Sequence, residues 1–402
     1  MSIELNNEQI YAVYDLENWW NKGSKQLFQI SGAAGTGKTT LVRYLIERLG
    51  LNNDQVLFLA FMGKAASQLA RNGLPAQTIH SAIYDYVKGP EIDENGRIVI
   101  NEKTNKPKIV SKFIKKDRIK KGVKLIVVDE ASMVSQEVAE DLMSFGIPII
   151  TLGDLNQLPP VYGSAFFLQE PDIILKQIMR QAEGDPIVWL SQEILSGREL
   201  KFGVYGNSAV IPKRDISEFQ FKNSDIILTG TNKLRYNVNN FCREQVKGIK
   251  MLEYPHIGEK VICRKNNWDK KIDKNIYLTN GTTGYVDYID RESFDGYTMN
   301  MDFRPDFSKS VFKDIKFDYK HMYETPGVTL NMEESESVKR RIIEKYNDKM
   351  EYAYAITVHS SQGSQWPNVL YLCENIMRSE EDNRKLNYTA ITRASKSITI
   401  VI

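Results

Sequence analysis

The chain has 402 residues, of which 42% are hydrophobic and 26% are charged, and its formal net charge is +2. These values are ordinary for a globular protein of roughly two to four compact units. The nearly neutral charge does not by itself indicate a nucleic-acid partner. No apolar run approaches the ~18 residues of a membrane span, and the N-terminus lacks the basic and apolar regions of a signal peptide. The three cysteines lie far apart, which fits a reduced cytoplasm and argues against a structural zinc site.

The first predicted strand, residues 26–30, leads through a glycine-rich loop into a helix predicted over residues 40–49. The loop, Gly32-Ala33-Ala34-Gly35-Thr36-Gly37-Lys38-Thr39, matches the phosphate-binding pattern G-x-x-x-x-G-K-[ST]. Its glycines let successive backbone N–H groups turn toward an anion, and the helix N-terminus adds partial positive charge. We expect Lys38 to reach the β- and γ-phosphates of a nucleotide, and the Thr39 hydroxyl to bind Mg²⁺.

Buried strands predicted over residues 56–60, 125–128 and 147–152 alternate with helical stretches, as in a parallel α/β sheet. The alternation breaks between about residues 84 and 122, where a polar stretch with turn signals predicts a small insertion containing a hairpin. It contains most of a basic run, residues 112–124, which is typical either of a solvated helix face or of a nucleic-acid contact.

Alternation resumes with a strand at residues 225–229 and a helix over residues 232–245. A second break, residues 251–348, contains short alternating strands and predicts a small β-barrel. The chain then closes with elements predicted at residues 369–372 (strand), 384–392 (helix) and 397–402 (strand).

Two carboxylates follow the strand at residues 125–128. Asp129 is placed to hold Mg²⁺ through water, and Glu130 to polarise the attacking water. Alone, such a pair would more often end a strand in a solvated turn; after a complete phosphate loop it favours a nucleotide site. The next strand is followed by Gly153-Asp154-Leu155-Asn156-Gln157-Leu158-Pro159-Pro160, in which Gln157 can sense the γ-phosphate and the prolines stiffen the loop.

The order of these motifs, together with Thr78-Ile79-His80, Arg180-Gln181, residues 357–363 and residues 389–393, resembles superfamily 1 DNA helicases. Asp129-Glu130-Ala131-Ser132-Met133, the loop at residues 153–160 and the positions of the insertions are similar to the 5′-to-3′ group, the RecD-like and Dda-like enzymes. The resemblance implies an α/β protein of two RecA-like P-loop NTPase domains with ATP between them. It also implies a strand-splitting hairpin insertion in the first domain and an SH3-like β-barrel insertion in the second. The implied boundaries are 1–84 and 122–182 for the first domain, 85–121 for the hairpin, 183–250 and 349–402 for the second domain, and 251–348 for the barrel.

The resemblance also implies roles for residues at the nucleotide. Gln9 would recognise adenine, Arg180 and Arg393 would stabilise charge on the γ-phosphoryl group, and Gln362 and Gly363 would couple that group to the DNA backbone. The implied catalytic residues are Lys38, Asp129, Glu130, Gln157, Arg180 and Arg393. ATP would be bound by Gln9, Gly35, Thr36, Gly37, Lys38, Thr39, Thr40, Gln362 and Gly363, and Mg²⁺ by Thr39 and Asp129.

The expected partner is single-stranded DNA at a duplex fork, bound without strong sequence preference because phosphate contacts and stacking do not read bases. The implied DNA-binding residues are Gly63, Lys64, Thr78, His80, Thr357 and His359. Relatives usually carry Pro-Thr where this chain has Phe61-Met62, so we expect Gly63 or Lys64 to supply that phosphate contact. Phe113 and Tyr86 are candidates for the aromatic residue that splits the strands. A single-stranded-DNA-binding or replication protein is a candidate further partner.

The leading hypothesis is an ATP-driven 5′-to-3′ DNA helicase, a minimal stand-alone motor similar to phage enzymes, working in the cytoplasm. One alternative is a translocase that displaces bound proteins and unwinds weakly. A strand-splitting wedge in the first insertion would distinguish the helicase from this translocase. A second alternative is an ATPase-dead DNA-binding subunit, which the intact catalytic residues oppose. A third is a small-molecule kinase, which would need neither Gln362 nor Arg393 nor a second α/β domain.

Overall fold

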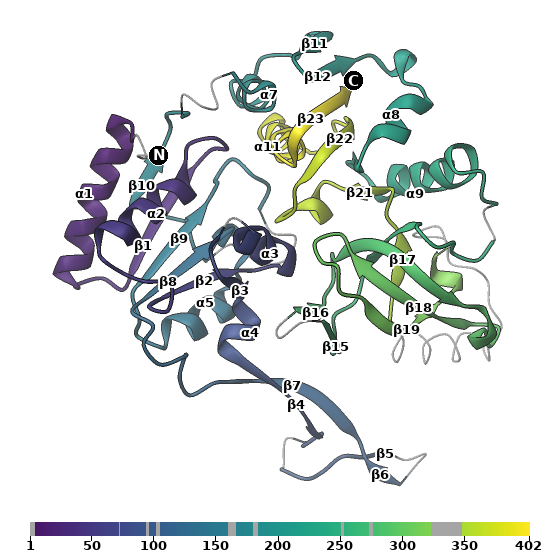
Figure 1. Ribbon diagram of the computed structural model, residues 1–402, viewed down its shortest axis with the longest axis horizontal. Helices are drawn as coiled ribbons and strands as arrows, with labels where there is room; N and C mark the ends of the chain where they lie inside the picture. The colour runs from purple at the N-terminus through teal and green to yellow at the C-terminus, as the bar shows by residue number, and fades with distance from the viewer. Residues whose placement is uncertain are drawn as a thin grey trace.

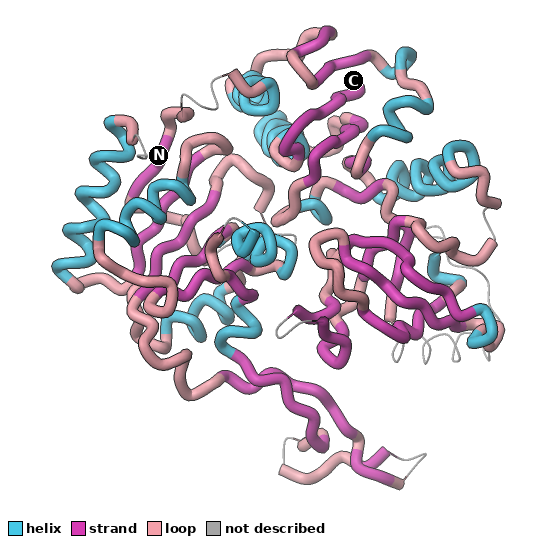
Figure 2. The backbone as a smooth tube through the Cα atoms, viewed as in Figure 1, coloured by secondary structure: helices cyan, strands magenta, loops and turns pink. Residues whose placement is uncertain are grey.

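The computed structural model describes residues 5–71, 73–93, 96–101, 105–159, 166–179, 184–250, 253–272, 276–322 and 348–402. Two parallel α/β sheets form the first and second domains, and an antiparallel sheet and a protruding hairpin extend from them (Figure 1). Figure 2 shows the helices gathered on the two parallel-sheet domains, whereas the hairpin and the antiparallel sheet consist mainly of strands and loops.

The first domain is built on six parallel strands in the order β10-β1-β9-β8-β2-β3. The strands are β1 (Leu27–Gly32), β2 (Val56–Ala60), β3 (Ala76–Thr78), β8 (Leu125–Asp129), β9 (Ile149–Gly153) and β10 (Ile173–Leu175). Consecutive residues of a strand point to opposite faces, so Phe58 belongs to one apolar cluster and Leu59 to another. This burial on both faces explains the continuous apolar runs in the sequence.

Helices cover both faces of this sheet. The cluster that contains Phe58 includes residues of α1 (Asn7–Lys22), α2 (Lys38–Arg48) and α3 (Gly63–Arg71). The cluster that contains Leu59 includes residues of α4 (Ile79–Ile83), α5 (Gln136–Met143) and the short 3₁₀ turn η1 (Ala131–Met133).

A long hairpin leaves the first domain directly after α4. Strand β4 (Tyr84–Pro90) pairs antiparallel with β7 (Ile109–Lys115), and a smaller pair, β5 (Ile100–Asn101) and β6 (Lys106–Pro107), lies farther out. Figure 1 shows this arm projecting away from the body of the molecule.

The second domain is built on six strands in the order β11-β12-β23-β22-β13-β21, with only β11 and β12 antiparallel. The strands are β11 (Gly203–Tyr205), β12 (Ser208–Ile211), β13 (Ile226–Thr229), β21 (Ala355–Thr357), β22 (Trp366–Leu372) and β23 (Ala394–Val401). Its helical elements are α7 (Pro186–Leu195), η2 (Lys213–Asp215), α8 (Glu218–Asn223), α9 (Asn232–Phe241), η3 (Cys242–Val246), η6 (His359–Ser361) and α11 (Glu380–Ile391).

An antiparallel sheet in the order β19-β18-β17-β14-β20 is inserted between β13 and β21. Its strands are β14 (Lys260–Cys263), β17 (Thr283–Asp290), β18 (Thr298–Pro305), β19 (Phe312–Asp318) and β20 (Met350–Tyr352), with the 3₁₀ turns η4 (Arg291–Ser293) and η5 (Lys320–Met322). A bridge between Phe317 and Asp348 joins the two ends of the sheet around an apolar core. The hairpin of β15 (Asn267–Ile272) and β16 (Ile276–Leu278) lies between this sheet and the first domain (Figure 1).

The alternating α/β organisation predicted from the sequence is present in both domains, while several element boundaries differ. Helix α2 begins at Lys38 rather than residue 40, because Gly37 adopts φ 77 and serves as its N-cap. Helix α11 begins at Glu380 rather than residue 384, because the Ser379 side chain accepts a hydrogen bond from the Asp382 N–H. No helix within the described ranges is long and apolar enough to cross a membrane.

Candidate nucleotide site and nucleic-acid groove

The phosphate loop joins β1 to α2 and depends on its glycines. Gly35 and Gly37 have φ 82 and 77, a region that side-chain-bearing residues rarely adopt. A Cβ added at Gly32 would lie 2.6 Å from Thr36 Oγ1. The Thr36 hydroxyl donates to the Ala33 carbonyl (2.8 Å), and Lys38 Nζ donates to the Gly32 and Ala33 carbonyls at 2.5 and 3.2 Å. The loop is therefore preformed, with its lysine folded over it.

Gln9 is tied to this loop from the start of α1. Its side chain is fully buried, and its Nε2 donates to the Thr36 carbonyl at 3.0 Å. A capping box fixes its orientation, since Asn6 accepts from the Gln9 N–H while Gln9 Oε1 accepts from the Asn6 N–H. A Cβ at Gly37 would lie 2.6 Å from Gln9 Nε2. The glutamine side chain therefore fits against the loop because position 37 is a glycine.

The predicted carboxylate pair lies at the end of β8, beside the phosphate loop. Asp129 and Thr39 border the same small cavity of the core, whose other lining residues, such as Val42 and Phe58, are apolar. Burial and the neighbouring Glu130 raise the pKa of Asp129 to about 6, and the charge of Lys38 opposes this rise. Glu130 adopts the left-handed conformation, φ 51, and its N–H donates to Asp129 Oδ1 at 2.9 Å.

The donor set at this position suits Mg²⁺. The described residues contain no group of three or more His, Cys, Asp or Glu side chains that could hold a metal by themselves. A hydroxyl from Thr39 and a carboxylate from Asp129 are two hard oxygen donors. Mg²⁺ is usually bound in this way, by one or two protein oxygens together with phosphates and water.

The loop after β9 contacts the second domain. Tyr388 on α11 accepts a hydrogen bond from the Ala34 N–H of the phosphate loop (2.8 Å) and donates to Asp154. The Leu158 N–H donates to Thr389 Oγ1 at 2.9 Å, and Gln362 Nε2 donates to the Leu158 carbonyl at 2.6 Å. Gln157 is half-buried in the same loop. Residues predicted at the nucleotide from the first and second domains therefore meet here.

Of the two arginines predicted to reach the γ-phosphate, only Arg393 lies in the described part of the chain. Arg393 is buried, and its guanidinium donates to the Thr389 and Ser364 carbonyls and to Thr392 Oγ1, all in the second domain. Its role across the domains stays a prediction. Arg180, with Gln181 and Pro160, lies outside the described residues.

Two further predicted ATP-binding residues are Thr40, which lies in the first turn of α2, and Gly363, which has φ 68 and adjoins Gln362.

A groove of about 670 Å³ runs between the first domain and the elements inserted in the second. Four of the predicted DNA-binding residues line it, namely Gly63, Thr78, His80 and His359. Thr357 lies behind the groove wall, nearly buried, with its hydroxyl on Ser360 Oγ at 2.9 Å. Residues that motif matching did not single out also line the groove; these are Arg264, Asn266, Trp268 and Tyr277.

Lys64 does not line this groove. Its Nζ pairs with Asp306 at 3.2 Å and lies 3.7 Å from the centre of the Trp366 ring. The sequence could not show this ion pair, because Asp306, in the turn after β18, meets Lys64 only in the folded chain. Of the two candidates for the missing phosphate contact, only Gly63 remains in the groove.

An aromatic cluster forms one end of the groove. The His80 ring stacks on Trp268 with a centroid distance of 5.9 Å and an interplanar angle of 27°, and Trp268 meets Phe113 edge-on at 4.7 Å. Burial lowers the pKa of His80. Tyr86 and Phe113 are cross-strand partners in the half of the hairpin nearer the domain and both contact Trp268, so neither wedge candidate lies at the outer end.

A phosphate loop, an adjacent carboxylate pair at the carboxyl edge of a parallel sheet and a second α/β domain against that edge define a two-domain P-loop NTPase. The model of the AAA domain family matches residues 4–214, and that of the UvrD-like helicase C-terminal domain matches residues 352–401. The chain belongs to this AAA-domain family, and it is similar to superfamily 1 helicases of the RecD-like, Dda-like and Pif1 type. The resemblance read from the motifs is confirmed.

Individual relatives match most of this chain at low identity. The ATP-dependent RecD2 DNA helicase of Deinococcus radiodurans is 25% identical over 92% of this chain and 46% of its own length. The ATP-dependent DNA helicase Pif1 of Campylobacter jejuni is 25% identical over 93% of this chain and 88% of its own length. An uncharacterized protein of Methanocaldococcus jannaschii, MJ1519, matches over 36% of its length, so the chain spans less than half of two of these relatives.

Solved structures show the shared fold. A Pif1 helicase from a study of forked duplex DNA unwinding has a TM-score of 0.52 and 16% identity, covering 99% of this chain and 92% of that chain. Pif1 helicase from Bacteroides in complex with ADP-AlF3 and single-stranded DNA has a TM-score of 0.50 and 17% identity over the same shares.

Proposed function

We propose that this chain is an ATP-driven DNA helicase that moves 5′ to 3′ along single-stranded DNA and separates the duplex ahead. The observation that carries this proposal is the position of the loop at residues 357–363. His359, Ser360 and Gln362 line the groove, and Gln362 also hydrogen-bonds Leu158 in the loop beside the nucleotide site. One short segment therefore touches both sites. The names of the relatives RecD2, Pif1 and Dda as ATP-dependent DNA helicases support a helicase function, and the 5′-to-3′ polarity rests on the resemblance of the motifs.

The nucleotide site fits ATP with Mg²⁺. The amides of the phosphate loop and Lys38 would bind the phosphates, Gln9 the adenine, and Thr39 with Asp129 the metal. When bound, Mg²⁺ neutralises charge on the β- and γ-phosphates. Glu130 would orient the attacking water, Gln157 would sense the γ-phosphate, and Arg180 with Arg393 would stabilise the charge that develops on it.

Hydrolysis would be coupled to movement through contacts between the domains. Tyr388, Thr389 and Gln362 of the second domain hydrogen-bond the phosphate loop or the loop after β9. A change of nucleotide state at those loops would shift the second domain and, with it, the loop at residues 357–363 in the groove. Hinge motion of this kind converts nucleotide state into a step along the strand.

The groove suits a single strand of any sequence. Trp268, Tyr277 and His80 offer ring surfaces for stacking, and Thr78 and the Gly63 backbone offer polar groups to phosphates. We assign the segment at residues 85–121 as the wedge at the fork and the segment at residues 251–348 as an SH3-like barrel that closes the groove.

One observation favours the translocase alternative. Residues 91–108, the outer part of the hairpin, contain no aromatic residue in the sequence, and its large exposed apolar side chains are Ile92, Ile98 and Ile100. Aliphatic side chains offer less stacking to an unpaired base than aromatic rings do. A motor with this arm would translocate well and unwind less efficiently than one with an aromatic tip.

The test is the rate of ATP hydrolysis with and without single-stranded DNA of arbitrary sequence. The proposal predicts strong stimulation by DNA and an affinity for DNA that falls with salt concentration, because phosphate contacts release counterions. Equal rates in both conditions would contradict the proposal and favour a small-molecule kinase.

A further inference from the structure

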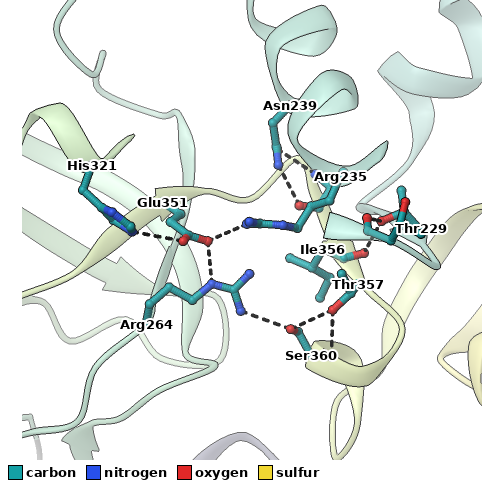
Figure 3. Close-up of polar contacts among 11 residues, drawn as sticks. Thr229, Arg235, Asn239, Arg264, His321, Glu351, Ile356, Thr357 and Ser360 are labelled. Carbon is teal, nitrogen blue, oxygen red and sulfur yellow. Dashed lines mark hydrogen bonds and ion pairs between the residues drawn. The ribbon is translucent and has the colours of Figure 1, made fainter. Parts of the chain in front are cut away.

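Arg264 is a charged side chain in the groove that no motif of the sequence identified. It follows β14 directly, lines the groove, and has a side chain 16% exposed. Its Nε donates to Glu351 Oε2 at 2.6 Å, and its Nη1 donates to Ser360 Oγ at 3.1 Å (Figure 3). The guanidinium is therefore held by two anchors, one on β20 and one on η6.

Glu351 is shared by several cationic or hydrogen-bonding groups. It also accepts a hydrogen bond from Arg235 on α9 at 2.5 Å and lies 3.1 Å from His321 Nε2, as Figure 3 shows. Burial by itself would raise the pKa of Glu351, but His321, Arg264 and Arg235 outweigh it and hold that pKa well below its usual range. Glu351 is thus a carboxylate throughout the physiological range.

The cluster carries an excess of positive charge that faces the groove. Two guanidiniums, Arg235 and Arg264, share the single carboxylate of Glu351. Arg235 is buried, with 5% of its surface exposed, and does not line the groove. Within the described part of the chain, Arg264 Nη2 makes no hydrogen bond. The N–H groups of this guanidinium nitrogen therefore remain available for another acceptor.

We propose that Arg264 binds a backbone phosphate of the single strand in this groove, and that Glu351 and Ser360 are positioning residues that hold its guanidinium. The assignment rests on the proposed function and extends it to a residue of the antiparallel sheet. A planar, always charged guanidinium held in place loses little freedom when it binds a phosphate. The neighbouring rings of Trp268 and Tyr277 favour a nucleic-acid phosphate over a free anion, because they offer stacking to the attached bases.

The position of the second anchor gives this contact a further consequence. Ser360 Oγ also hydrogen-bonds Thr357 Oγ1 at 2.9 Å, and both belong to the segment whose Gln362 contacts Leu158. Arg264 is therefore two hydrogen bonds from Thr357, at the end of β21.

The experiment measures binding of a fluorescein-labelled oligothymidylate by anisotropy at several salt concentrations. Arg264→Ala should bind roughly tenfold more weakly, since it loses one charged hydrogen-bonding contact. The slope of log affinity against log salt should become shallower by about 0.7, the value for one phosphate on a single strand. Arg304→Ala is the matched control: Arg304 lies on β18, pairs with Asp287 at 2.9 Å, and does not line the groove, so affinity and slope should stay as in the wild type.

Two further variants separate binding from positioning. Arg264→Lys keeps the charge but cannot hold both anchors, so it should keep the wild-type salt slope and bind more weakly. Ser360→Ala changes no charge and should weaken binding by roughly threefold with an unchanged slope. If Ser360 acts through Arg264, it should have no further effect in the Arg264→Ala background, which a double-mutant cycle measures. Thermal denaturation of each variant checks that it is folded.

The outcomes distinguish a failure of the proposed function from a failure of the Arg264 contact alone. A wild-type protein that does not bind the oligonucleotide would overturn the proposed function, and the Arg264 contact with it. Wild-type binding together with an unchanged affinity and salt slope for folded Arg264→Ala would overturn the Arg264 contact alone. An additive loss in the double variant would overturn the positioning role of Ser360.

Discussion

Side chains at the nucleotide site are held mainly by the backbone around them. Lys38 donates to two carbonyls of its own loop, and Gln9 donates to a third. Such contacts preorganise the loop without an ion pair, which leaves the lysine charge available for a phosphate.

Lys38→Ala should abolish ATP hydrolysis and leave the fold intact, because the lysine supplies the charge for the β- and γ-phosphates and packs little apolar surface. Lys222→Ala, which removes an exposed lysine paired with Glu218, is the control and should hydrolyse ATP normally. A folded Lys38→Ala protein that keeps more than about a tenth of the normal rate would remove this loop from the catalytic site.

Stability should depend on pH through His80. Burial places its folded pKa below the unfolded value, so the unfolded chain binds the proton more tightly. Stability contributed by neutral His80 is complete above about pH 6.5 and is lost as the pH falls below that value. His80→Phe keeps an aromatic ring and should lose less stability than the wild type between about pH 7.5 and about pH 5.5 in urea unfolding.

In the proposed mechanism, the hairpin of β4 and β7 decides between unwinding and translocation. Its base is fixed to β15 by the Phe113–Trp268 contact and by an ion pair of 2.7 Å between Lys88 and Asp269. A rigid arm at the fork can exclude one strand while the motor pulls the other. Opening costs roughly 1.4 kcal/mol per base-pair step, an amount that the motor must supply wherever stacking on the arm does not.

Replacing residues 90–109 by a short turn should separate the two activities. The truncation keeps Tyr86, Phe113 and the contact with Trp268, so the groove should still bind DNA and stimulate ATP hydrolysis. Strand separation should be lost, as measured on a tailed duplex. Full unwinding by the truncated protein would show that the wedge lies elsewhere.

Side chains of the second domain hydrogen-bond the first domain at the phosphate loop and at the loop after β9. Tyr388 is fully buried and bridges Ala34 and Asp154 of the first domain, whereas Tyr371, also fully buried, donates to Asn387 within the second domain. The two tyrosines thus differ in whether their hydroxyls join the domains.

Tyr388→Phe should loosen the domains in the absence of nucleotide, because it removes a cross-domain bridge and leaves buried Asp154 without that donor, at a cost of about 1–3 kcal/mol. Fluorescence energy transfer between labels on the two domains should show a broader distance distribution. Tyr371→Phe should keep the wild-type distribution. Identical distributions for both variants would rule out a bridging role for Tyr388.

Both α/β domains and the phosphate loop could be predicted because their signals are local: apolar runs, glycines at fixed positions, and carboxylates after a strand. Trp268 and Arg264 could not, because they reach the groove only through pairing of the antiparallel sheet and its hairpin. Lys64 is one of two predicted substitutes for the phosphate contact of the absent Pro-Thr, but Asp306, distant in the sequence, pairs with it. Tyr86 and Phe113 were predicted as wedge residues, but cross-strand register places them against Trp268.

In the proposed function, ATP hydrolysis drives this protein 5′ to 3′ along one strand and opens the duplex ahead of it. The most direct test compares unwinding of two duplexes of identical sequence, one with a 5′ single-stranded tail and one with a 3′ tail, in the presence of ATP and Mg²⁺. We expect unwinding of the 5′-tailed duplex and little of the 3′-tailed one, and no unwinding of either by Lys38→Ala. Preferential unwinding of the 3′-tailed duplex would contradict the polarity, and failure to unwind either despite DNA-stimulated ATP hydrolysis would contradict the helicase assignment in favour of a translocase.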